Sequence, residues 1–94
     1  MTLQGTPAGA RTTPKIERVQ TGVRIEKRLL KVLKALAEFY DVSLGDLLEG
    51  IVLHAFEGRS AFEERSRERI ATLMKVYEID YGARDSHQLV EQDA

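Results

Sequence analysis

Apolar and polar residues alternate along one short stretch near the start of the chain. Val19, Thr21, Val23 and Ile25 occupy the odd positions, and polar residues or glycine lie between them. A period of two is typical of a β-strand with one buried face. The pattern therefore predicts a strand over residues 18–25. Because no second strand follows, we expect it to pair with the same strand of another copy, which makes the protein a homodimer.

After this stretch the apolar residues recur at helical spacing. Leu29, Leu33 and Leu36 share one face of a helix that is expected to end near residue 41, and lysines form a narrow polar stripe opposite. Ser43, with Asp46 three residues later, resembles a capping box and predicts the start of a second helix that ends at Gly58.

The second predicted helix is apolar over about half of its circumference, wider than the stripe of about 100° that one packing layer needs. We expect it to contact both the first helix and the equivalent helix of a second chain. The residues expected in the core of this dimer are Val19, Val23, Ile25, Leu33, Leu47, Leu48, Ile51 and Val52.

A third amphipathic helix is predicted over residues 59–82. Ser60 and Glu63 repeat the capping pattern, and Gly82 is a natural terminator. Residues 1–17, rich in Gly, Thr, Pro and Ala, are expected to form a flexible arm, and residues 83–94 a polar tail with at most a short turn. The expected fold is thus mainly α, with one short strand per chain.

The net charge of −1 conceals a strong asymmetry. Eight basic and two acidic residues precede Glu38, a net charge of +6, whereas six basic and thirteen acidic residues follow from that position, a net charge of −7. A basic half suits a polyanionic partner. Chance clustering on a solvated surface would be favoured if the basic half did not coincide with the predicted strand.

Several classes of function find no support in the residues. The chain contains no cysteine, and its two histidines, His54 and His87, belong to no metal-ligand or nucleophile–base spacing. We expect neither enzymatic activity nor a cofactor or metal. The N-terminal residues do not have the pattern of a signal peptide, and no apolar run approaches the length of about 20 residues that spans a bilayer. A cytoplasmic protein without a membrane partner is the default.

Strand, helix, short turn and helix follow one another over residues 18–58. In this order and at these lengths, the segment resembles the ribbon-helix-helix family of dimeric prokaryotic DNA-binding proteins, which includes the Arc, MetJ and CopG repressors. The resemblance implies an intermolecular antiparallel two-stranded ribbon that enters the major groove, so residues 18–58 would be the DNA-binding and dimerisation domain.

Carried over to this sequence, the resemblance implies that Gln20, Gly22 and Arg24 are the base-reading positions. Gly22 departs from the family, whose central reading position normally carries a polar side chain. The resemblance also places Ser43 and Leu44, at the start of the second helix, on a phosphate. An N-cap serine is common in any helix, and polar strand residues are often merely solvated, so both simpler interpretations stay open.

Further phosphate contacts are predicted from charge and position alone, at Lys15, Arg18, Lys27 and Arg28. The leading hypothesis is a repressor-like, sequence-specific transcriptional regulator whose partner is double-stranded DNA. The alternative is an antitoxin-like or other protein-interaction module in which residues 60–94 bind a partner protein.

Overall fold

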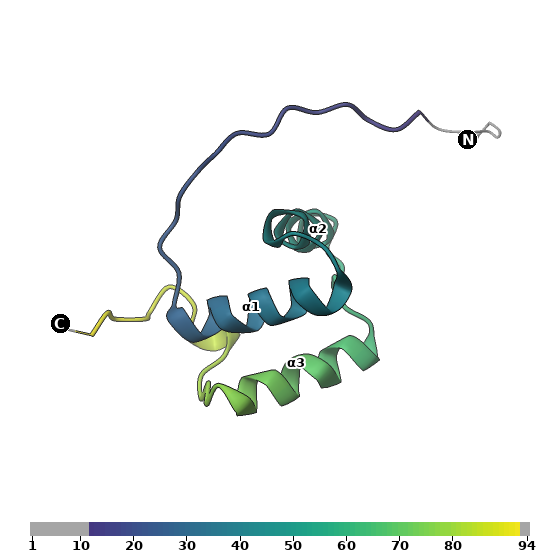
Figure 1. Ribbon diagram of the computed structural model, residues 1–94. Coiled ribbons are helices and arrows are strands. Elements are labelled where there is room, and N and C mark those ends of the chain that lie inside the picture. The colour runs from purple at the N-terminus through teal and green to yellow at the C-terminus, as the bar shows by residue number, and fades with distance from the viewer. Residues whose placement is uncertain (1–11, 93–94) are drawn as a thin grey trace.

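The computed structural model describes residues 12–92, and these residues form three α-helices and one short 3₁₀ turn (Figure 1). Helix α1 spans Lys27–Tyr40, α2 spans Leu44–Phe56, α3 spans Glu64–Val76, and the turn η1 spans Ala83–Asp85. Helix α1 lies between the other two, and both α2 and α3 pack on it (Figure 1). This arrangement makes α1 the centre of the molecule.

The core lies on one helix. The buried apolar side chains of the described residues are Val32, Leu36 and Ala37, all from α1, and Leu36 is the most deeply buried at 2% exposure. The spacing of four and then one places them on one side of a helix. The amphipathic pattern of the first predicted helix is therefore confirmed. Helices α2 and α3 both pack on α1.

The helix ends follow local chemistry. The Ser43 hydroxyl accepts the backbone N–H of Asp46 at 3.0 Å, so the predicted cap of α2 is confirmed. Gly58 follows α2 with a φ of +72°, a conformation that glycine adopts without steric cost. Asp41 ends α1 in the left-handed region, with a φ of 60°.

The predicted start and end of the third helix are wrong. Ser60 does not cap it: its hydroxyl bonds to the backbone of Phe62, and α3 begins at Glu64 without a side-chain cap. The helix also ends at Val76 rather than at Gly82. Beyond it, Glu78 adopts a φ of 58° and the chain turns back toward α1. The capping pattern at Ser60 and the glycine at position 82 therefore do not mark the ends of α3.

The predicted strand, and the ribbon-helix-helix fold class built on it, are contradicted. Residues 12–26 have no regular secondary structure, and no strand or sheet occurs in the part of the chain that the structure describes. Val19 is 78% exposed and Val23 is 80% exposed, so the alternating pattern does not produce a buried face. A strand needs a ladder of hydrogen bonds to a neighbouring strand, which alternation of side chains alone does not supply. The architecture is all-α.

Because so few side chains form the core, we expect the fold to be sensitive to its central residue. Leu36→Ala should lower the free energy of unfolding by about 2–5 kcal/mol, from lost burial and the cavity left behind. Urea unfolding followed by circular dichroism measures this. Leu89→Ala, in the exposed C-terminal segment, is the matched control and should change stability by less than about 0.5 kcal/mol; equal effects would contradict the central position of α1.

Candidate nucleic-acid interface

An extended, exposed segment leads into α1 and carries the predicted base-reading residues. It runs from residue 12 to residue 26 and curves past α2 before it reaches α1 (Figure 1). Gln20, Gly22 and Arg24 are all exposed on it, as is Lys15. A Cβ atom placed on Gly22 would meet nothing within 4 Å, so packing does not require glycine there. These four positions are therefore accessible to solvent.

One ion pair ties this segment to α2. The Arg18 guanidinium donates to both carboxylate oxygens of Glu49, from Nε at 2.9 Å and from Nη2 at 2.8 Å. The bonds from Arg18 lower the pKa of Glu49, and the same bonds raise the pKa of Arg18. Both side chains are largely exposed, so this pair contributes little to stability. It connects the extended segment to the first half of α2.

A cluster at the start of α1 joins this helix to the chain that follows α3. The Glu26 carboxylate caps α1 by accepting the backbone N–H of Arg28 at 3.0 Å, and it also accepts the Tyr81 hydroxyl at 2.6 Å. The Arg28 guanidinium donates to the Glu78 carbonyl at 2.6 Å and lies 5.7 Å from the centre of the Tyr81 ring. We call Glu26, Arg28, Glu78 and Tyr81 the clasp.

The clasp shifts two titrations in opposite directions. The hydrogen bond from the Arg28 backbone, followed by that from Tyr81, lowers the pKa of Glu26 to about 2. Partial burial and the bond to Glu26 raise the pKa of Tyr81 to about 12. A charged Glu26 and a protonated Tyr81 are therefore the states that the fold favours.

Beyond the clasp, a second contact brings the C-terminal segment to Arg24, one of the predicted base-reading residues. Arg24 forms an ion pair with Glu91, and both side chains are mostly exposed. The C-terminal segment consequently lies beside the start of α1 (Figure 1). The sequence predicted a helix over residues 59–82 and a polar tail over residues 83–94, and neither prediction includes these two contacts. Neither contact has a signal in local periodicity.

The remaining predicted phosphate contacts fall on two helix starts. Lys27 is exposed at the first residue of α1, whereas Arg28 is half-buried in the clasp. Ser43 is exposed and Leu44 half-buried at the start of α2. The Ser43 hydroxyl already accepts the N–H of Asp46, whose carboxylate is also exposed there. The start of α1 is therefore the more cationic of the two.

The predicted dimer-core residues are only partly covered in this chain. Leu33, Leu47 and Ile51 are half-buried, but Leu48, Val52 and the extended-segment residues are exposed. No residue of α2 is buried, although the helix is rich in apolar side chains. Further apolar exposure on α2 falls on Leu53, at 60%, and Phe56, at 83%. We call Leu48, Val52, Leu53 and Phe56 the open face of α2.

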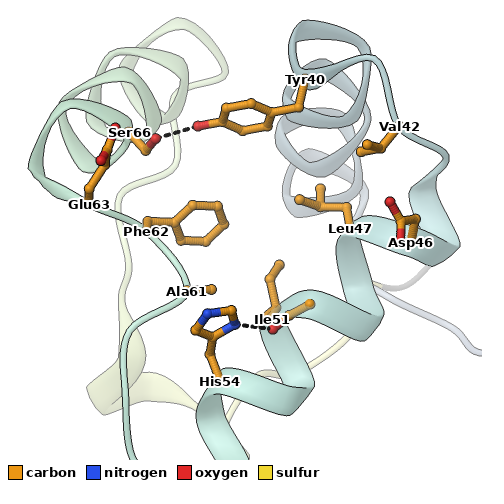
Figure 2. Close-up of a pocket in the computed structure, with 11 residues that line it drawn as sticks. Tyr40, Val42, Asp46, Leu47, Ile51, His54, Ala61, Phe62, Glu63 and Ser66 are labelled. Carbon is orange, nitrogen blue, oxygen red and sulfur yellow. Dashed lines mark hydrogen bonds between the residues drawn. The ribbon is translucent and has the colours of Figure 1, made fainter. Parts of the chain in front are cut away.

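A mainly apolar pocket of about 520 Å³ lies between the end of α1, α2 and the start of α3 (Figure 2). Leu47, Ile51 and Phe62 line it, and a short hydrogen bond joins Tyr40 and Ser66 across its upper wall. His54 lies at the lower end, where its Nδ1 bonds to the Gly50 carbonyl at 2.7 Å. The histidine thus bonds within its own helix.

Other kinds of site are not found in the described residues. Within residues 12–92, no group of three or more His, Asp or Glu side chains is placed to hold a metal ion. None of the three helices is long and apolar enough to cross a membrane. No protein-family model, curated protein or solved structure matches the chain.

The clasp predicts how stability depends on pH. Glu26 should stabilise the fold above its ordinary pKa of 4.5 and lose this effect as the pH falls toward 2. Tyr81 should stabilise the fold below its ordinary pKa of 10.0 and lose this effect as the pH rises toward 12.

Urea titrations of the wild type and of Tyr81→Phe between pH 2 and pH 12 measure this dependence. At neutral pH the variant should be less stable by about 1 kcal/mol, because it lacks one hydrogen bond. Above pH 10 the difference should shrink, because the wild type alone loses the Tyr81 contribution. A difference that stays constant up to pH 12 would contradict the clasp.

Proposed function

We propose that the protein binds double-stranded DNA through the basic segment from Lys15 to Lys34, acts as a homodimer, and regulates transcription. The observation that carries the proposal is the exposure of this segment: its cationic side chains extend from an unpacked stretch of chain into the first turns of α1. Duplex DNA carries a charge every 1.7 Å or so along its axis, and cations that neutralise phosphates release condensed counterions.

The geometry of the segment suits a long polyanion. Residues 12–26 reach at most about 50 Å when fully extended. They include Lys15, Arg18 and Arg24, and Glu17 is the one acidic residue between residue 12 and the clasp. Lys27, Lys31 and Lys34 continue the positive charge along α1. Such a segment can follow the phosphate backbone without a rigid surface behind it. Side chains that project from it can then reach base edges in a groove.

Base recognition is assigned to Gln20 and Arg24. A glutamine pairs with the N6 and N7 atoms of adenine and an arginine with the O6 and N7 atoms of guanine, each through two hydrogen bonds. Both side chains are exposed, and the open space at Gly22 between them lets the backbone approach a base pair closely.

The proposed dimer follows from the open face of α2. One chain buries three apolar side chains in its described part, too few for a stable domain of this size, whereas the open face leaves apolar area in contact with water. Full burial of a Leu, Val or Phe side chain contributes about 1.5–3 kcal/mol. A second copy covers this face and doubles the number of basic segments. Two-fold symmetric dimers match two half-sites on DNA.

The alternative proposal, a protein-interaction module, rests on the same open face. Residues 60–94 were expected to bind the partner, but the apolar side chains of Phe62, Leu73 and Tyr77 in this part of the chain are half-buried. If a partner protein is bound, α2 is the helix that offers it an apolar surface.

Titration of a duplex by fluorescence anisotropy at several salt concentrations tests DNA binding. Contacts to six to eight phosphates should give a slope of log affinity against log salt of about −5 to −7. Lys27→Ala should reduce the magnitude of this slope by about 1 and weaken all sequences equally. Arg24→Ala should lose about 1–3 kcal/mol of discrimination between a selected and a random duplex. Lys75→Ala, on α3, is the control and should leave both quantities unchanged, and failure of the wild type to bind at low salt would overturn the proposal.

Sedimentation equilibrium tests the dimer. The wild type should sediment as a dimer at micromolar concentration, and its unfolding temperature should rise with concentration. Leu53→Glu should dissociate it, because a charge would enter an apolar contact. Val76→Glu, which replaces a similarly exposed apolar residue on α3, should not. A wild-type protein that is monomeric but captures one protein partner through α2 would instead support the interaction module.

A further inference from the structure

The tail segment, residues 83–92, lies against the surface that the proposed function assigns to DNA. Two observations place it there: the clasp fixes Tyr81 to Glu26, and Glu91 pairs with Arg24. The tail carries net negative charge, with one basic residue against three acidic ones from residue 83 to the end of the chain. A polyanion-binding side chain is thus paired with an anion from its own chain.

We propose that the tail is an autoinhibitory competitor of DNA: the Glu91 carboxylate occupies the Arg24 guanidinium in the free protein and is displaced when a duplex binds. This inference rests on the proposed function and adds a regulatory contact to the same surface. The competing groups are chemically alike, because carboxylate and phosphate oxygens, and the O6 and N7 atoms of guanine, all accept the same guanidinium donors.

The tail is attached in a way that suits a displaceable competitor. Between the clasp and Glu91 it buries no large apolar side chain: Leu89 is 52% exposed and Val90 is 91% exposed. The arginine and the glutamate of the pair are themselves 85% and 72% exposed. Exposed ion pairs of this kind are weak. The tail therefore opens without disturbing the helices.

Covalent attachment explains how so weak a contact can compete. Tyr81 is held on α1, so the ten residues that follow it form a short tether to Glu91. Short flexible tethers give effective concentrations in the millimolar range. The pair is formed in the structure, so a ligand that needs Arg24 must first displace Glu91.

Duplex binding by full-length variants tests this inference. Glu91→Gln should bind duplex DNA about two- to fivefold more tightly than the wild type, which is the factor expected from loss of one exposed ion pair. Glu38→Gln is the matched control: it removes the same charge from an exposed position at the far end of α1 and should change affinity by much less. If both variants gained affinity equally, the effect would be one of net charge alone, and the inference would be overturned.

A second measurement follows the tail itself. The chain has no cysteine, so Gln92→Cys allows a single spin label next to Glu91. In the free protein the label should broaden the amide signals around Arg24, and saturation with duplex should restore them. Broadening that persists in the saturated complex would overturn displacement while leaving DNA binding intact. If no variant binds duplex at any salt concentration, the proposed function itself fails, and the inference fails with it.

Discussion

The structure depends on the burial of one face of α1. Val32, Leu36 and Ala37 supply the described apolar core, and α2 and α3 are held because each covers part of this helix. Side chains in such a core are close-packed, so adding or removing one methylene group there affects the packing of both α2 and α3. The extended segment and the C-terminal segment are positioned in turn by where α1 begins. Unfolding of α1 would therefore also remove the contacts that position the candidate interface.

The clasp converts this packing into a link between distant parts of the chain. Glu26 is both the cap of α1 and the acceptor for Tyr81, so one carboxylate satisfies a backbone donor of the helix and anchors Tyr81, which lies beyond α3. A charged acceptor at a helix start is also favoured by the helix dipole. The C-terminal segment thereby lies beside the basic segment, and the acidic and basic parts of the sequence meet.

The basic segment and the open face of α2 suit different kinds of partner. The basic segment concentrates positive charge on exposed, extended chain, which favours a polyanion. The open face of α2 presents apolar side chains that favour another protein surface, and in the proposed function that surface is a second copy. The two features lie on neighbouring elements, linked by the pair between Arg18 and Glu49. Assembly and DNA binding are therefore proposed to involve the same side of the molecule.

Local sequence is sufficient to predict the first two helices. The stripe of α1 and the Ser43 cap of α2 are local: they follow from side-chain spacing and from hydrogen bonds within one turn. Exposure of Gln20 and Arg24 also follows from their polarity. The alternation around Val23 was misleading, because periodicity gives the preferred backbone conformation but not the neighbour that a strand requires.

The contacts between segments far apart in the chain depend on how the helices pack in three dimensions. Tyr81 reaches Glu26, and Glu91 reaches Arg24, because α3 ends at Val76 and the chain turns back at Glu78. No local pattern encodes that turn, since the Ser60 capping pattern and Gly82 indicated a longer helix. These contacts depend on the direction in which α3 packs on α1, and that direction is a property of the whole fold.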